Sequence, residues 1–199
     1  MDISGLLSYG VSFAIMGGIY AIFALGLNVQ WGYTGLFNIG IAGFFAVGAY
    51  TSALLTTPMP EGVYATYVEQ LVGLDLPFPV GLLGAAITSG VLALIVGIPT
   101  LRLREDYLAI ATIGIAETIR LIFNNERWLA NGPRGLTGLP QPLRSWVEPS
   151  QYHYLYLVLV GLVLVALYWA SERGIRSPWG RVLRAIREDE VAAAMQGKN

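Results

Sequence analysis

The sequence contains no cysteine and little charge. Without cysteine the chain has no disulfide bonds, no thiolate metal site and no cysteine nucleophile. It has a single histidine, which leaves too few nitrogen ligands for a metal site, so we expect none. Charged residues make up 13% of the chain, against about 25% in a soluble domain. That fraction is too low to cover the surface of a soluble protein.

The charges that are present also carry no excess of either sign. Lysine and arginine number 12 and the acids 13, which gives a formal net charge of −1. No basic field is available to hold a nucleic acid backbone. The chain has neither a GxxxxGK[ST] phosphate loop nor a GxSxG nucleophile motif. These absences argue against an ATP-binding site in this chain and against an enzyme, including a membrane-bound hydrolase.

What the sequence does have is long apolar blocks, with 55% of its residues hydrophobic. A helix needs about 20 such residues to cross a bilayer. Five blocks approach this length, near residues 6–27, 36–55, 80–101, 107–123 and 154–170. The first is preceded by Asp2 and no cation, unlike a secretory signal, so we expect it to be a retained span. The predicted fold is an all-α polytopic transmembrane bundle of about five spans, with residues 1–199 as a single domain.

The positions of the cations predict the orientation of these spans. Eight cations lie in the link between the third and fourth spans or after the fifth: Arg102, Arg104, Arg173, Arg176, Arg181, Arg184, Arg187 and Lys198. Three others lie in the link between the fourth and fifth spans: Arg127, Arg134 and Arg144. We therefore expect the C-terminal tail in the cytoplasm. An odd number of spans then places the N-terminus outside.

Small residues recur at a spacing of four in the second and third spans. The pairs are Ala42 with Ala46, Ala49 with Ala53, Ala86 with Gly90, and Ala93 with Gly97. This spacing lets helix backbones approach closely in lipid. We expect these pairs to mediate packing within the bundle.

The region between the first two spans combines glycines with amide side chains. Residues 28–48 hold Gly32, Gly35, Gly40, Gly43 and Gly48 together with Asn28, Gln30 and Asn38. Glycine weakens a helix, and an amide in hydrocarbon needs a hydrogen-bonding partner. Two interpretations are open: a broken or re-entrant helix beside a wet cavity, or a short polar turn followed by a glycine-rich helix. The first makes Gln30 and Asn38 candidates for the translocation path.

The fourth span carries an acid and a base within the apolar region. Glu117 and Arg120 are three residues apart and so share a helix face. At 1.5 Å per residue, Glu117 lies about 15 Å from Tyr107, near the middle of the bilayer. One interpretation is an ion pair that only fixes helix packing. The other is a polar group that lines the substrate path or locks a gate, which makes both residues candidates for the path.

Residues 177–199 have the pattern of two short cytoplasmic helices. Ser177 is a suitable N-cap with Pro178 at the first helical position. The next eleven residues place an apolar face opposite a basic one; the apolar face holds Trp179, Val182, Leu183 and Ile186, and the basic face Arg181, Arg184 and Arg187. Asp189 is expected to cap a second helix over residues 190–196, ended by Gly197. Its apolar row of Val191, Ala194 and Met195 is small enough to enter a groove on a partner.

Four segments in order resemble the Liv-type permeases of branched-chain amino acid ABC importers, a family that includes LivM-like subunits. They cover nearly the whole chain: LGLNVQWGYTGLFNIGIAGFFAVGAYTSALL (25–55), DYLAIATIGIAETIRLIFNN (106–125), NGPRGLTGLP (131–140) and SPWGRVLRAIREDEVAAAMQGKN (177–199). Many relatives carry a histidine where this chain has Ile41, which leaves no polar role for that position here. Family members are also longer, so the resemblance implies that the domain is incomplete at its C-terminus.

The resemblance implies a multi-pass permease in the inner membrane of a bacterium or archaeon that carries branched-chain or other neutral amino acids. Its expected partners are two cytoplasmic ATPase subunits, a second permease subunit and a periplasmic substrate-binding protein. ATP would bind those ATPases, and this chain would bind no cofactor. The residues expected to couple to the ATPase are Asp189, Glu190, Val191, Ala194, Met195 and Gly197. Alternatives are a permease for urea or short amides in the same importer class, and an autonomous secondary transporter or channel.

Overall fold

The computed structural model describes residues 3–60, 62, 72–103, 105–149 and 151–195. These residues are predominantly helical, and their only β-type pairing is an isolated bridge between Pro58 and Leu74. The elements are α1 (Ile3–Leu27), the π-helix η1 (Asn28–Tyr33), α2 (Ile41–Thr56), α3 (Phe78–Thr100), α4 (Glu105–Asn125), α5 (Arg127–Ala130), the 3₁₀ turns η3 (Gly132–Arg134) and η4 (Arg144–Trp146), α6 (Tyr152–Arg176), α7 (Pro178–Glu188) and α8 (Glu190–Met195). The all-α prediction is confirmed.

A helix stands at each of the five predicted spans, but the helices differ in length and polarity. Three are long and apolar enough to cross a membrane: Gly5–Tyr33, Phe78–Thr100 and Tyr152–Arg176. The second, α2, has 16 residues, about 24 Å at 1.5 Å per residue and short of the ~30 Å hydrocarbon core. The fourth, α4, has 21 residues but carries four charged ones, Glu105, Asp106, Glu117 and Arg120. Length and composition alone therefore identify three of the five helices as spans.

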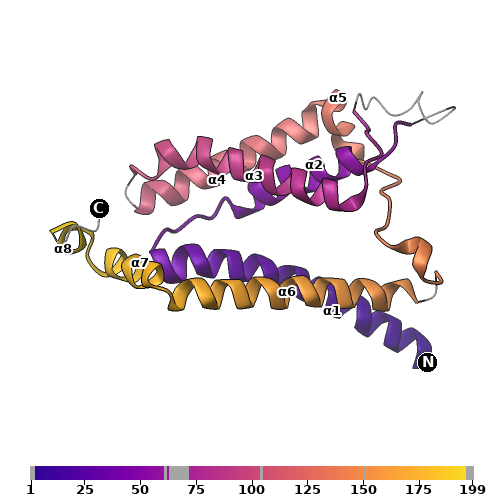
Figure 1. The fold of residues 1–199 in the computed structure, drawn as a ribbon. Helices are drawn as coiled ribbons and strands as arrows, with labels where there is room; N and C mark the ends of the chain where they lie inside the picture. The colour runs from indigo at the N-terminus through magenta and orange to yellow at the C-terminus, as the bar shows by residue number, and fades with distance from the viewer. Residues whose placement is uncertain (1–2, 61, 63–71, 104, 150, 196–199) are drawn as a thin grey trace. The chain divides into compact units, whose positions relative to one another are not determined.

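The chain forms two compact units. One contains Met1–Phe37 and Leu143–Asn199, and the other contains Asn38–Pro142. In the first unit α1 packs along α6, α6 is followed by α7, and α7 contacts both η1 and α8. Figure 1 shows that α1 and α6 run in the same direction, so their C-terminal ends lie at the end of the unit where α7 begins.

Small side chains allow α1 and α6 to approach each other. Ile15 of α1 and Val160 of α6 are buried there, with exposed fractions of 8% and 6%. A Cβ on Gly18 would lie 2.7 Å from Cγ1 of Val160. Because a real Cβ does not approach so closely, glycine at position 18 sets the separation of the two helices.

In the second unit α2 packs against both α3 and α4. Towards α4, a Cβ on Gly43 would lie 2.9 Å from the Cα of Ala116, and Tyr50 stacks on Phe123 with 4.2 Å between ring centroids. Towards α3, the Ser89 hydroxyl donates a 3.0 Å hydrogen bond to the Phe44 carbonyl. The Thr88 hydroxyl donates a second, of 3.1 Å, to Thr51 Oγ1. Small residues and interhelical hydrogen bonds, the usual means of association in lipid, thus hold this unit together.

The four-residue pairs predicted to mediate packing are not the residues at these contacts. Gly90 and Gly97 have no neighbour within 4 Å of the position of a Cβ, and Ala42, Ala49, Ala86 and Ala93 are exposed. The close contacts are made by other glycines, among them Gly40, Gly43, Gly48, Gly81 and Gly84. Neither Ala86 with Gly90 nor Ala93 with Gly97 makes a close contact within its own unit, because the spacing of small residues defines a stripe but not the side of the helix that meets a neighbour.

Candidate translocation and coupling sites

The first span continues six residues beyond its predicted end at Leu27. Asn28–Tyr33 form a π-helix in direct continuation of α1, and the chain leaves the helix at Thr34. A π-helical turn is rare and often marks a functional position. Asn28 and Gln30 therefore belong to the helical part and not to a short polar turn, and a broken or re-entrant helix beside a wet cavity stays a prediction.

Hydrogen bonds around Gln30 and Trp31 close the end of this π-helix. The Gln30 carbonyl accepts from the Thr34 hydroxyl and, at 3.2 Å, from the Leu36 N–H. The Trp31 carbonyl accepts a 3.2 Å bond from the Gly35 N–H. Gly35 has φ +76°, a left-handed conformation that glycine adopts without strain. The backbone can therefore turn sharply at Gly35 while the last carbonyls of the helix stay paired.

Gln30 has a buried side-chain oxygen without a hydrogen-bonding partner. Its Oε1 is one of two such buried side-chain atoms among the described residues. A buried acceptor left unpaired costs about 1–3 kcal/mol, so such a group is usually retained for a reason. Gln30 therefore remains a candidate for contact with a substrate or a neighbouring subunit.

Asn38 has a local role at the start of α2. Its Oδ1 accepts a 2.9 Å hydrogen bond from the Gly40 N–H, which orients the backbone two residues ahead as in an Asx turn. The next N–H, of Ile39, donates to Thr112 Oγ1 on α4 at 3.2 Å. The side chain thus has a structural explanation, and its place in the translocation path stays a prediction.

Glu117 and Arg120 form the predicted ion pair on α4. Arg120 Nε donates to Glu117 Oε2 at 2.9 Å, and Nη2 donates to Oε1 at 2.6 Å. The two side chains are 51% and 65% exposed, respectively. A paired but uncovered charge of this kind needs water or another protein surface, because lipid tails cannot solvate it. Of the four predicted path residues, Gln30 belongs to one unit and the other three to the second.

The turn from α6 into α7 is formed as predicted. Ser177 is the N-cap of α7 and its side chain accepts from the Gly180 N–H at 3.4 Å, with Pro178 in the first helical position. Gly180 lies against the last turn of α6: a Cβ there would lie 2.6 Å from the Cα of Ile175. Arg184 Nη2 also donates a 3.5 Å bond to the Ile175 carbonyl. These contacts fix the angle at which α7 leaves the membrane helix.

The close approach of Gly180 to Ile175 leads to a testable prediction. Gly180→Ala is expected to force α7 away from α6 and to cost about 1–3 kcal/mol, as overpacking does, lowering Tm by about 2–10 °C. Thermal unfolding of the detergent-solubilised protein measures the change. Gly174→Ala is the matched control, because Gly174 has open space around it and alanine is the better helix former. Equal Tm values for the two variants would contradict the tight turn.

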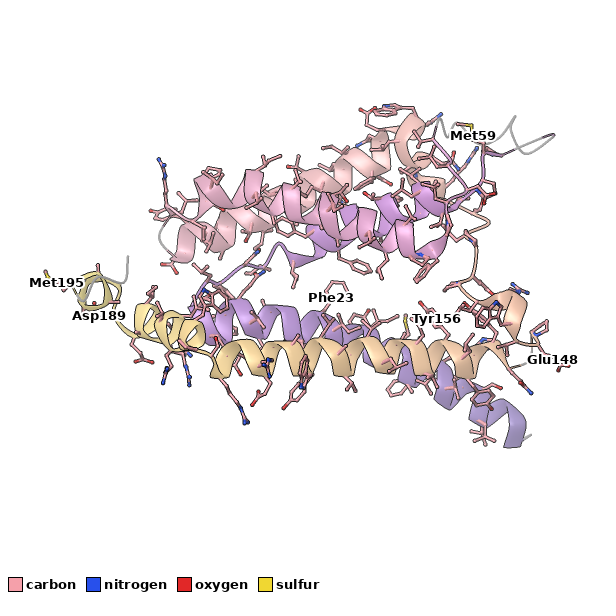
Figure 2. The ribbon with its side chains drawn as sticks, in the orientation of Figure 1. Phe23, Met59, Glu148, Tyr156, Asp189 and Met195 are labelled. Atoms are coloured by element: carbon pink, nitrogen blue, oxygen red, sulfur yellow. The ribbon has the colours of Figure 1, made fainter. Side chains whose placement is uncertain are left out.

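The second of the two tail helices, α8, is short and exposed. Asp189 has an extended backbone, and its Oδ1 accepts from the Ala192 N–H at 2.9 Å, which confirms it as the cap of α8. Figure 2 labels Asp189 and Met195 at the two ends of this helix. Ala193 is buried, Ala194 is exposed, and Met195 is 85% exposed. The side-chain surroundings of Glu190 and Val191, and all of Gly197, lie outside the described part of the chain.

Arg187 is placed differently from the sequence prediction. The pattern assigns it to the basic face of α7, but its Nη1 donates a hydrogen bond to the Gly32 carbonyl at the end of η1. A Cβ on Gly35 would lie 3.1 Å from Cγ of Arg187. One signal could have suggested this: Arg187 follows Leu183 by four residues, so it borders the apolar face.

A cavity of about 630 Å³ lies at the C-terminal end of α6. It is lined by Tyr168, Trp169, Glu172, Arg173, Arg176 and Ser177. Its two arginines are already engaged, because Arg173 lies over the Trp169 ring and Arg176 pairs with Glu172. None of the predicted path residues lines it, so this cavity does not add to the translocation path. Among the described residues no group of three or more histidine or acidic side chains is placed to hold a metal ion.

Comparison with known proteins gives a consistent result. The sequence model of the family described as "branched-chain amino acid transport system / permease component" matches residues 9–199. The chain is 34% identical to the high-affinity branched-chain amino acid transport system permease protein LivM of Salmonella typhimurium and 35% identical to that of Escherichia coli, in each case over 94% of this chain and 46% of the relative. It is 29% identical to a probable LivM of Methanocaldococcus jannaschii, over 92% of this chain and 57% of that protein. The chain thus spans about half the length of these curated relatives. No solved structure matches it.

Proposed function

The chain belongs to the family of branched-chain amino acid transport permeases, and on this premise we propose that it is a membrane permease subunit of an ABC importer. Its cargo is a branched-chain or other neutral amino acid. The observation that carries the proposal is the family match over nearly all of the chain, whose described residues form three helices long and apolar enough to cross a membrane. The chain acts as a transporter component and not as an enzyme.

The partners follow from the way such an importer works. Two cytoplasmic ATPase subunits bind ATP, a second permease completes the path, and a periplasmic binding protein delivers the amino acid. This chain binds no cofactor of its own. The exposed Ala194 and Met195 on α8 support a docking role for that helix. A short helix with a small apolar row suits a groove on an ATPase subunit.

We place the C-terminal tail in the cytoplasm and the N-terminus outside. Cation distribution supports this orientation, because seven of the eleven arginines lie between α3 and α4, in the last turn of α6 or after it. The parallel course of α1 and α6 supports placing the N-terminus and the tail on opposite sides, because an odd number of spans from α1 to α6 makes the two helices run in the same direction. The end of the first span then lies at the cytoplasmic side, beside α7.

The mechanism is alternating access. ATP binding and hydrolysis move the ATPase pair, α8 follows that movement, and the spans expose the path to one side and then the other. The permease contributes a difference in fit between two states rather than covalent chemistry. A zwitterionic cargo needs polar groups in the path, and we propose Gln30, Asn38, Glu117 and Arg120 for this role. The unpaired Oε1 of Gln30 supports the first of them.

Two alternatives differ from this proposal in energy source or cargo. A secondary transporter would use Glu117 as its ion-coupling carboxylate, but this carboxylate already accepts two hydrogen bonds from Arg120. A permease for urea or short amides would keep the same architecture and differ in the binding protein that supplies the cargo.

Reconstitution tests the proposal. The full permease, its second permease subunit and the ATPases are placed in liposomes with the binding protein, and uptake of labelled leucine, valine and urea is measured. We expect leucine and valine uptake that requires ATP hydrolysis and stops with a non-hydrolysable analogue. Uptake that continues without ATP would replace the proposal with secondary transport, and uptake of urea alone would change the cargo.

A further inference from the structure

Arg187 joins two parts of the chain that are far apart in sequence. It lies near the end of α7, and its Nη1 donates a hydrogen bond to the Gly32 carbonyl, 155 residues away. The stem of the side chain contacts the same region: a Cβ on Gly35 would lie 3.1 Å from Cγ and 3.8 Å from Cβ of Arg187. Both the guanidinium and the backbone of α7 at this position are therefore held against the end of the first span.

The surface that Arg187 meets is suited to a cation and to a close approach. The last carbonyls of a helix carry partial negative charge, and a guanidinium satisfies them favourably. Gly35 has no side chain and a positive φ, so the backbone turns there and leaves room for the arginine stem. The contact thus depends on features of both partners.

The segment held by Arg187 also contains Gln30. The π-helix η1 runs from Asn28 to Tyr33, and the Gln30 carbonyl accepts from Thr34 and Leu36 on either side of Gly35. A displacement of the Gly32–Gly35 backbone therefore acts on hydrogen bonds of Gln30, the residue with the unpaired buried oxygen.

Arg187 is also close in sequence to α8, the helix proposed to dock on the ATPase. Two residues further along, Asp189 caps α8. Arg181 lies on the same helix, is exposed, and is separated from Arg187 by six residues. Arg184 does not share the contact of Arg187 with the first span: it donates to the carbonyls of Gly180 and Ile175 at the turn from α6 into α7.

We propose that Arg187 is a positioning residue that transmits movement of α8 to the π-helical end of the first span and so to Gln30. This inference rests on the proposed function. In this proposal the ATPase moves α8, α7 moves with α8, and the Arg187 contact passes the movement of α7 to the first span. Loss of the contact leaves ATP hydrolysis intact and disconnects it from transport.

The first experiment measures the number of amino acids imported per ATP hydrolysed in the reconstituted importer. Arg187→Gln is expected to assemble and to hydrolyse ATP at the normal basal rate, while uptake per ATP falls about tenfold, a usual size for coupling between two sites. Arg181→Gln, which removes an equal charge from the same helix, is expected to keep the normal ratio. If uptake and hydrolysis fall in parallel, Arg187 only stabilises the fold and the proposal is wrong.

The second experiment restores the contact covalently. The chain has no cysteine, so Gly35→Cys with Arg187→Cys introduces a single pair, and the 3.8 Å between the two Cβ positions suits a disulfide. A side chain at φ +76° is strained, so Gly35→Cys alone is the reference for the double variant. The reduced double variant is expected to be uncoupled and the oxidised one to regain uptake per ATP, whereas Gly35→Cys with Arg181→Cys is expected not to cross-link. Absence of a cross-link in the first pair, or a cross-link that leaves the ratio unchanged, would refute the proposal.

Failure of the Arg187 contact and failure of the proposed function give different experimental results. Cross-linking in isolated membranes tests the contact between α7 and the first span without any transport. If the cross-link forms but the unmodified importer shows no ATP-driven uptake, the proposed function fails and the role of Arg187 in coupling fails with it. If the unmodified importer transports and the oxidised pair does not recover, only the inference about Arg187 fails.

Discussion

Replacing Ala194 by glutamate is expected to abolish the ATPase stimulation that substrate-loaded binding protein produces, and uptake with it. Ala194 is exposed on α8, next to the 85% exposed Met195. A docking groove that accepts an alanine and a methionine excludes water, and a carboxylate in it has no partner. We therefore expect stimulation to fall to the basal rate. ATPase activity with and without the loaded binding protein measures the effect.

The matched control for this prediction lies on the same helix. Ala192 is also exposed, but two residues at 100° each place it on the opposite side of α8 from Ala194. Ala192→Glu adds the same side chain and charge to the same short helix and is expected to keep most of the stimulation. Membrane insertion, checked by fractionation, should be normal in both variants. Full stimulation in Ala194→Glu would remove α8 as the docking element.

Replacing either member of the Glu117 and Arg120 pair is expected to harm transport more than replacing both. The pair neutralises itself through two hydrogen bonds, so Glu117→Gln leaves an unpaired guanidinium in the membrane and Arg120→Gln leaves an unpaired carboxylate. We expect uptake to fall by roughly an order of magnitude in each single variant and by clearly less in the double variant. Uptake rates at equal amounts of protein in the membrane measure the coupling.

A second pair in the same chain serves as the control for this cycle. Glu172 and Arg176 form an i,i+4 pair with a 2.6 Å contact near the end of α6, where a solvated ion pair contributes little. The corresponding cycle of single and double glutamine variants is expected to show little effect and little coupling. If the losses of uptake at Glu117 and Arg120 simply add, the two residues act separately. The ion pair is then not the reason that either residue is needed for transport.

Local sequence patterns predicted where the tail helices begin. A serine followed by proline predicted the start of α7, and an aspartate after the basic run predicted the cap of α8; both are present with the expected hydrogen bonds. These bonds connect residues three apart, so the information that specifies them lies within a short window of sequence. The apolar blocks behave similarly, because the hydropathy of about 20 residues predicts where a helix can cross lipid.

Local sequence patterns did not predict where the first span ends. Asn28 to Gly35 has the composition of a turn, yet the helix continues to Tyr33 as a π-helix. The end of this π-helix also contacts α7, a segment more than 140 residues away, where Arg187 donates to the Gly32 carbonyl. No window of local sequence contains that partner, so composition alone does not reveal the contact.

The sequence by itself determined the membrane environment, the positions of the helices, the caps of the tail and the pairing of Glu117 with Arg120, because each depends on hydropathy or on neighbours within one helical turn. Only the tertiary structure decided which glycines meet another helix and where Arg187 points. Gly43 and Gly90 are both small residues in apolar helices, yet only Gly43 meets a neighbouring backbone. The physical reason is that helix packing selects a face by the fit of two surfaces, and the second surface comes from a distant part of the chain.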